Sequence, residues 1–461
     1  MNKKIVLSIV AIFAALSMAN FTMSQEAYAY KSDVNPIDSR NVPDSEMDRE
    51  IVFPDEVLHR QLNQKMGRGD NTNPITIGDT INKQIVNPQI PVFSIGDIHS
   101  QDGTSQILKN LEGIQYFDIC DGAQIVSVSG LISDFSPIDC HENFGNATGR
   151  QFNYSPSVPD LKDSPEITNL GDIGGYFTYI MMGVVNFSPN TLNNFNIGES
   201  LTSFTVETSN ISDVSFLSKF NTTKSIRVGL TNANISDISV LGKMNFLPAG
   251  ELNEWGYYNV NYRFGFSGNN ITKVPENVYS LRNVMIELDD NKIADSTYAE
   301  ELYATLLDKL KQNGKLDSFN DDPDKRAYHL STIGHQNQRP EITVHSKTFT
   351  NPLRDKNGNS IPVQETEFIK NGENGTIVLL VNDQKGSVST GFDNTRGFNG
   401  TLTINYDFTQ PEMPGLAKES PVDDIKAPST GFGQDYLPFV AIVVLAIATL
   451  FFINRQNKIR L

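Results

Sequence analysis

The sequence predicts a solenoid of the α/β type, made mostly of strands and short 3₁₀ turns with helical caps. An all-β sandwich and a C-terminal transmembrane helix should follow it. Three observations carry this prediction. A near-identical phrase recurs in the middle of the chain, strand-like alternation replaces it after residue 340, and an uncharged apolar run lies near the C-terminus. The spacing of the phrase, the length of the alternating segments and the length of the apolar run match those of repeat units, strands and a bilayer span, respectively.

The recurring phrase reads ISDVSFL at residues 211–217 and ISDISVL at 235–241. Looser copies start at Ile271 and Ile293, so the isoleucines are 24, 36 and 22 residues apart, and ISDFSPI at 132–138 has the same form. A short alternating segment precedes each copy after residue 200, giving the pattern L-x-L-x-x-N-x-I of a leucine-rich repeat. Such units bury their apolar edges against each other.

The alternation also predicts which strand residues point inward and which line one concave face. Val206, Leu230, Phe266 and Leu288 should stack in one interior row. The outward positions are the candidate ligand-binding residues Thr205, Glu207, Arg227, Gly229, Gly265, Ser267, Glu287 and Asp289.

Asparagine at the turn after each strand normally hydrogen-bonds the backbone. Asn269 and Asn291 occupy this position, whereas Ser209 and Ala233 replace it at two other turns, which should be less well tied.

The 36-residue spacing leaves room for an additional loop that contains Trp255, Tyr257 and Tyr258. Aromatic side chains on a projecting loop are candidate binding hot spots. We therefore add these three residues to the candidate ligand-binding set. The alternative is a local lid that folds back on the solenoid.

The chain has two cysteines, Cys120 and Cys140, and neither belongs to a C-x-x-C pair. In an exported protein the natural interpretation is one disulfide closing a short loop, which stabilises a fold by about 3 kcal/mol. Two buried free thiols are the alternative.

The N-terminus predicts export. Lys3 and Lys4 precede an apolar core, and Ala27-Tyr28-Ala29 is an A-x-A cleavage site, with an uncleaved anchor as the alternative.

The predicted order is a signal peptide (1–29), a flexible leader (30–49), an N-terminal cap (50–105), leucine-rich repeats with insertions (106–295), a C-terminal helical cap (296–335), an immunoglobulin-like (Ig-like) domain (340–410), a linker (411–426), a sorting motif (427–431), a transmembrane segment (436–453) and a basic tail (454–461).

The wording I-S-D-I/V-S-x-L resembles the internalin-type leucine-rich repeat proteins of Gram-positive surfaces. The segment FPD at 53–55 with the amphipathic helix after it resembles the N-terminal cap of internalins, and NPLRDKNGNSIP at 351–362 resembles the Ig-like domain behind their repeats. The resemblance covers roughly residues 50–410. It implies a non-catalytic binding protein at a cell surface.

The C-terminus looks like a sortase sorting signal. Ala427-Pro428-Ser429-Thr430-Gly431 stands where L-P-x-T-G is usual, and an apolar span and the basic residues Arg455, Lys458 and Arg460 follow. This order implies a sortase and a cell-wall or envelope precursor as partners. A retained membrane helix is the alternative.

Composition narrows the function further. The formal charge of −17 argues against nucleic acid and anionic lipid as partners. No H-E-x-x-H, G-x-S-x-G or P-loop motif occurs, so we expect no enzyme, no cofactor and no metal site. The sequence predicts a secreted, wall-anchored adhesin-like protein that binds a protein or glycan on a host or neighbouring cell. A structural envelope protein without a specific ligand is the alternative.

Overall fold

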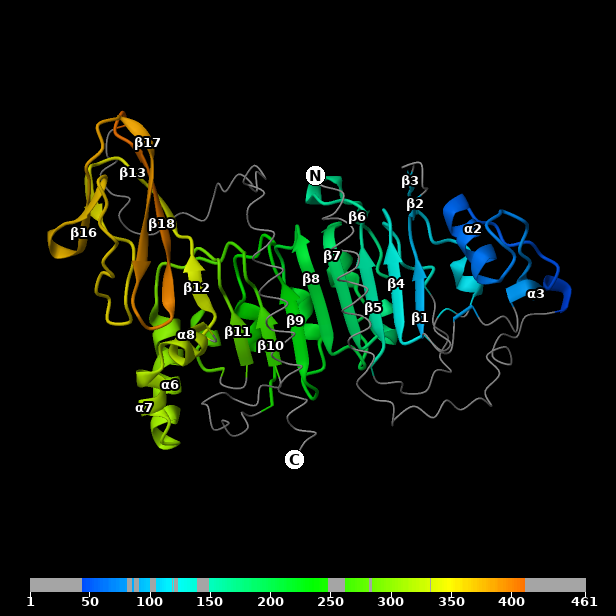
Figure 1. Cartoon of the computed structure of the whole chain (residues 1–461), viewed down its shortest axis with the longest axis horizontal. Helices are drawn as coiled ribbons and strands as arrows, with labels where there is room; N and C mark the ends of the chain where they lie inside the picture. The colour runs from blue at the N-terminus through cyan, green and yellow to red at the C-terminus, as the bar shows by residue number, and fades with distance from the viewer. Residues whose placement is uncertain are drawn as a thin grey trace. The chain divides into compact units, whose positions relative to one another are not determined.

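The computed structural model describes residues 44–410, apart from 81–84, 87–90, 100–104, 118, 120–122, 139–148, 248–261, 282–283 and 332. A parallel sheet runs through the middle of this part of the chain (Figure 1). Its strands, in spatial order, are β1 (Val92–Ile95), β4 (Ile125–Ser129), β5 (Gln151–Ser155), β7 (Tyr179–Phe187), β8 (Ser203–Ser209), β9 (Ile226–Leu230), β10 (Tyr262–Gly265) and β11 (Val284–Glu287), and β6 (Glu166–Ile167) pairs with β7. Because each strand pairs in parallel with the next repeat's strand, this arrangement is a leucine-rich repeat solenoid. The sheet begins at Val92, inside the range assigned to the N-terminal cap.

The predicted interior row is confirmed. Val206 pairs with Leu230, Phe266 lies one residue beyond the register pair of Gly229 and Gly265, and all four predicted side chains, including Leu288, are fully buried. A second buried row consists of Phe93, Val126, Phe152, Ile180, Phe204, Val228, Phe264 and Ile286. These two rows supply the solenoid with a continuous apolar core.

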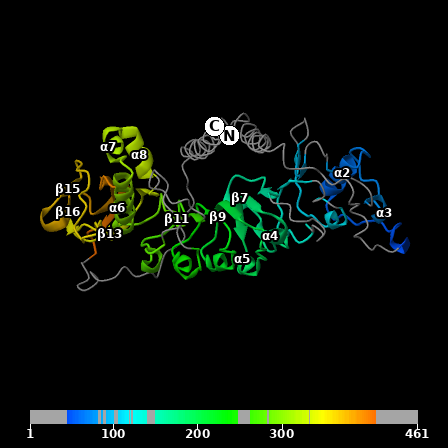
Figure 2. The same ribbon diagram turned by 90° about the horizontal axis from the view of Figure 1, so that it is seen from below.

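Short helical turns form the second layer. They are the 3₁₀ helices η4 (Ile114–Tyr116), η6 (Ser215–Lys219), η7 (Ser239–Lys243) and η8 (Glu276–Val278), and the one-turn helices α4 (Ile173–Tyr176) and α5 (Thr191–Asn194). The 3₁₀ helix η5 (Leu161–Asp163) instead contacts the end of β7, where Asn186 Nδ2 donates to Leu161 O (2.6 Å). In Figure 2, α4 and α5 lie on one side of strands β7 and β9.

The phrase I-S-D-V-S has a direct physical explanation in this layer. Ile211 and Val214 are buried, while the Asp213 carboxylate accepts hydrogen bonds from Ser215 N (2.8 Å) and Ser215 Oγ (3.0 Å). Asp237 caps Ser239 in the same way, at 2.7 Å and 2.9 Å. The aspartate therefore fixes the turn from which the 3₁₀ helix starts.

A ladder of buried amides ties the turns after the strands. Asn269 accepts a hydrogen bond from Ile235 N (3.1 Å) and donates to Leu230 O (2.8 Å). Asn291 repeats this contact with Ile271 N (3.0 Å) and Phe266 O (2.8 Å). Each asparagine thus supplies hydrogen bonds to buried backbone groups of the preceding repeat.

The turn at Ser209 is tied by a different residue from the one the sequence suggested. Asn210 accepts from Phe187 N and donates to Phe187 O, both at 2.8 Å, so this turn is anchored to the preceding repeat despite lacking the expected asparagine. The prediction that it is less well tied is therefore wrong.

The N-terminal end of the described region consists of η3 (Asp44–Glu46), α2 (Glu56–Lys65), α3 (Ile77–Thr80) and the hairpin of β2 (Ile98–His99) and β3 (Ser105–Gln106). Asp55 caps α2 by accepting from Val57 N (2.9 Å). Its second oxygen accepts from Lys109 N (2.7 Å) and Asn110 N (3.0 Å). One carboxylate therefore both starts the helix and binds it to the first repeat.

After β11 the chain forms α6 (Thr297–Gln312), α7 (Leu316–Asp321) and α8 (Pro323–Ser331). Helix α6 lies within the range predicted as a C-terminal helical cap, 296–335; it buries Tyr298, Leu306 and Leu310 and is followed by Gly314 at φ +65°.

Two small sheets follow. One contains β12 (His335–Gln338), β13 (Glu341–Val344), β17 (Lys385–Asp393) and β18 (Phe398–Asp407), and the other contains β14 (Thr348–Thr350), β15 (Ile369–Asn371) and β16 (Thr376–Leu379), with η9 (Glu373–Gly375) between β15 and β16. That these sheets form an Ig-like domain stays a prediction.

Strand β12 joins the solenoid to these sheets. Leu288 N donates to Gly334 O (2.6 Å) and Asp290 N donates to Gln336 O (3.0 Å), so the segment continues the parallel sheet beyond β11. Gln338 then acts as the next member of the amide ladder. It accepts from Ile293 N (3.2 Å) and donates to Leu288 O (2.7 Å).

Candidate functional site

The outward strand positions form continuous rows across the sheet. Ser94, Ser127, Asn153, Met181, Thr205, Gly229, Gly265 and Glu287 are successive register partners. We call the outward face this row together with the outward positions two residues before it and two residues after it on each strand. A second row contains Gln151, Tyr179, Ser203, Arg227, Arg263 and Met285.

The predicted site residues on strands all lie on the outward face. Glu207 and Arg227 are exposed, and Thr205, Ser267, Glu287 and Asp289 are half-buried. Gly265 is buried because it lacks a side chain and lies below its neighbours. A Cβ placed there would lie 3.4 Å from the Glu287 carboxylate.

Sequence reasoning missed Arg263, which is the register partner of Arg227. Its guanidinium forms an ion pair with the Glu287 carboxylate, and the two side chains are 35% and 26% exposed. The outward face therefore has two adjacent arginines beside an acidic group.

Tyr179 and Met181 were also missed. They lie on the outward face with 41% and 37% of their surface exposed. The copies of the repeated phrase in the sequence leave the repeats between residues 139 and 200 unassigned. The alternation of Ile180 and Met182, which pair with Phe152 and Tyr154, was the signal that could have found them.

The acidic end of the outward face responds to pH. Burial raises the pKa of the Asp289 carboxyl group from 3.8 to about 7, although a hydrogen bond from Gln336 N (2.5 Å) opposes the rise. The nearby carboxylates of Glu287 and Asp290 add to it. Because the folded chain holds this proton more tightly than the unfolded chain, Asp289 contributes stability that increases as pH falls from 7 to 3.8.

The other predicted site residues lie outside the described residues. They are Cys120 and Cys140 of the candidate disulfide, Trp255, Tyr257 and Tyr258 of the aromatic loop, and residues 427–431 of the sorting motif.

Within the residues that the structure describes, no group of three or more His, Cys, Asp or Glu side chains is arranged to hold a metal ion. No helix in this part of the chain combines the length and apolar character needed to cross a membrane, and the predicted span at 436–453 lies outside the described residues.

Comparison with known proteins gave matches only among solved structures. No family model and no curated protein matches the chain. Internalin C2 from Listeria monocytogenes strain 4b F2365 is 17% identical, with 54% of this chain and 91% of that chain covered and a TM-score of 0.31. The internalin InlF of the same strain is 14% identical, with 55% and 80% covered and a TM-score of 0.24.

A functional domain of InlJ from Listeria monocytogenes, which includes a cysteine ladder, is 13% identical, with 77% and 97% covered and a TM-score of 0.21. These identities and TM-scores are too low to assign a family or a ligand to the chain. The solenoid assignment rests on its own register and core.

Proposed function

We propose that this chain is a non-catalytic surface protein that binds a protein or glycan of a host or neighbouring cell through the outward face. The observation that carries the proposal is the exposure of Tyr179 and Met181, which lie two residues apart on β7 in two adjacent, mostly polar rows of the outward face. Isolated exposed apolar residues are common, but an aromatic residue and a methionine side by side on a rigid sheet can act as a binding anchor.

The scaffold supports such a role physically. Two fully buried rows lie beneath the outward face, so its side chains are presented with little freedom to move. Preorganised side chains lose little conformational entropy when they bind. The adjacent Arg227 and Arg263 and the exposed Glu207 add charges that can orient a partner. The predicted loop residues Trp255, Tyr257 and Tyr258 belong to the same proposed contact.

Replacing Tyr179 and Met181 together by alanine should weaken capture of cells that bind the wild-type chain by about tenfold or more, because both anchors are lost. The measurement is binding of the full chain to a panel of candidate host and bacterial cells. Phe368→Ala with Leu380→Ala is the matched control. These two side chains are exposed to similar extents, 46% and 45%, and lie in or beside the small sheet of β14, β15 and β16.

The control should bind as the wild type does. Equal binding by the Tyr179/Met181 variant would place the site elsewhere. Absence of binding to every cell type would instead favour the structural envelope protein without a specific ligand.

We further propose that a sortase attaches the chain to the envelope at Thr430. The sortase thiolate would attack the Thr430 carbonyl, break the bond to Gly431 and form a thioester, releasing the segment that starts at Gly431. An amine of the envelope precursor would then attack the thioester, form an amide with Thr430 and release the thiol. The motif, the apolar span and the basic tail support this order of events.

Replacing Thr430 by alanine should shift the protein from the envelope to the membrane or the medium, because the acyl-enzyme would form poorly. Mass spectrometry of enzyme-digested envelope should find wild-type peptides that end at Thr430 and carry a cross-bridge remnant. Recovery of wild-type peptides that continue through residues 432–453 would show a retained membrane anchor instead.

A further inference from the structure

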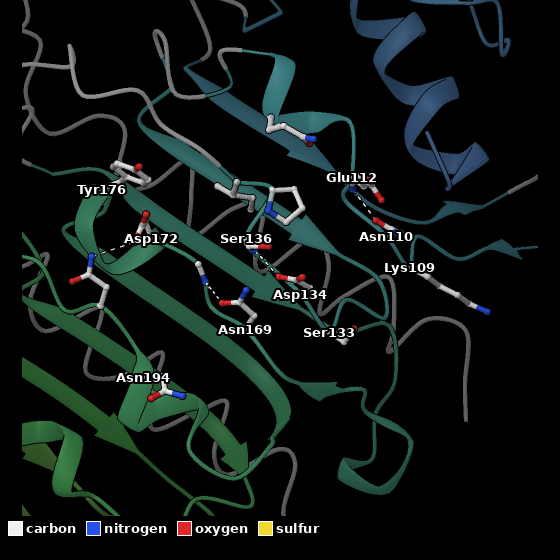
Figure 3. A pocket seen from close by; sticks show the side chains of 15 residues that line it. Lys109, Asn110, Glu112, Ser133, Asp134, Ser136, Asn169, Asp172, Tyr176 and Asn194 are labelled. Carbon is white, nitrogen blue, oxygen red and sulfur yellow. Dashed lines mark hydrogen bonds between the residues drawn. The ribbon is translucent and has the colours of Figure 1, made fainter. Parts of the chain in front are cut away.

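A polar groove of about 1020 Å³ lies along the loops that follow the early strands (Figure 3). Its lining comes from four successive stretches, at residues 109–115, 133–138, 169–176 and 194–196. None of the predicted ligand-binding residues lines it, so it is distinct from the outward face.

Three side chains in the groove are held in place by bonds to their own turns. Oδ1 of Asn110 accepts from Glu112 N (2.7 Å), Oδ1 of Asp134 accepts from Ser136 N (2.8 Å), and Oδ1 of Asn169 accepts from Gly171 N (2.9 Å). Among the described residues, no hydrogen bond uses Nδ2 of either asparagine or Oδ2 of the aspartate. Each side chain is exposed and fixed, with one polar atom left for a ligand.

The turns that carry these polar atoms belong to successive repeats. Asp134 and Asn169 form a parallel β-bridge, and Leu131 N donates to Leu108 O (2.7 Å) just before the two earlier stretches of the lining. The successive turns therefore offer a donor, an acceptor and a donor in order along the groove (Figure 3). Such an order suits a ligand that is itself made of repeated polar units.

The charge of the lining narrows the class of ligand. The groove has one cation, Lys109, and three carboxylates, Glu112, Asp134 and Asp172, so anionic ligands are disfavoured. Asparagine, serine and glutamine side chains provide most of the other polar groups. They both donate and accept hydrogen bonds, as sugar hydroxyls do.

One end of the groove adds an aromatic side chain. Tyr176 is half-buried against the core and lies near Asp172, whose carboxylate accepts a hydrogen bond from Asn196 Nδ2 (3.1 Å) (Figure 3). An aromatic ring beside fixed polar groups can pack on the apolar face of a sugar ring while its hydroxyls are hydrogen-bonded.

We infer that the groove binds a neutral oligosaccharide, with consecutive sugar units lying across Asn110, Asp134 and Asn169. The Nδ2 groups of the two asparagines donate to ligand oxygens, and Oδ2 of the aspartate accepts from a hydroxyl. This inference does not depend on the proposed use of the outward face.

The test is calorimetric titration of the full chain with cellotetraose and chitotetraose as neutral probes and a heparin tetrasaccharide as an anionic probe. Asn169→Asp and Asn110→Asp retain the oxygen that caps each turn but replace the groove-facing donor by a charged acceptor. We expect at least one neutral probe to bind and each variant to weaken its binding by about tenfold or more.

Asn221→Asp is the matched control. Asn221 also caps a turn, accepting from Thr223 N (3.0 Å), and the substitution adds the same charge outside the groove. It should bind as the wild type does. Failure of both neutral probes to bind, equal binding by Asn169→Asp and the wild type, or tighter binding of the heparin probe would each overturn the inference.

Discussion

Replacing Asn291 by alanine is expected to lower the free energy of unfolding by about 2–4 kcal/mol. The Asn291 side chain is fully buried, accepts from Ile271 N, and donates to Phe266 O and to Leu288 O (3.0 Å). Alanine would leave Ile271 N without its partner and would remove one donor each from Phe266 O and Leu288 O, which keep hydrogen bonds from Asn269 Nδ2 (2.9 Å) and Gln338 Nε2 (2.7 Å). A buried N–H without a partner costs about 1–3 kcal/mol and each lost hydrogen bond about 0.5–1.5 kcal/mol, and water entering the cavity would recover part of the sum.

Urea unfolding followed by circular dichroism would measure this change. Asn234→Ala is the matched control, because Asn234 is exposed on the turn after β9 and, among the described residues, its side chain has one long contact, of 3.5 Å, to Asn270. The control should lose less than about 0.5 kcal/mol. A loss for Asn291→Ala as small as that of the control would mean that the amide ladder does not stabilise the repeats.

Replacing Arg396 by alanine should destabilise the chain by about 3–5 kcal/mol at neutral pH. Its guanidinium lies 2.8 Å from Oε2 of Glu300, a side chain of α6 that is only 1% exposed. The other oxygen of Glu300 accepts from Ser296 Oγ (2.6 Å). Without Arg396, the buried carboxylate loses its counter-ion but keeps its desolvation cost.

A second substitution separates this effect from lost packing. Glu300→Gln in the Arg396→Ala background removes the buried charge and should recover at least half of the lost stability, as measured by chemical unfolding. Arg49→Ala, which breaks an exposed pair with Glu46, should cost less than about 1 kcal/mol. If the double variant were no more stable than Arg396→Ala, an uncompensated charge would not be the cause.

The sequence was sufficient to predict the structure wherever neighbouring residues determine it. In the phrase I-S-D-V-S, apolar positions face the core and an aspartate caps a turn two residues away, so a few neighbouring residues determine the structure. The same holds for α6, whose apolar face repeats at helical spacing. The outward face followed from strand alternation alone wherever the repeats were regular.

Tertiary structure decided the contacts between residues that are distant in sequence. Tyr154 supplies a hydroxyl, rather than the amide of the repeat pattern, to Ile132 N (3.1 Å) and Gly130 O (3.1 Å). Burial raises the pKa of Tyr154, which keeps this hydroxyl protonated and able to donate. No pattern in the sequence near Tyr154 identifies this role.

The contacts at the junction after β11 also leave no pattern in the sequence. Gln338 continues the amide ladder 50 residues after Leu288, and Arg396 neutralises Glu300 across 96 residues. The groove likewise collects side chains from four separate stretches. The sequence by itself determined the repeat unit, because its periodicity reflects local burial and turn geometry. Only the tertiary structure decided which distant polar groups meet, because such pairs need a shared location and leave no regular spacing along the chain.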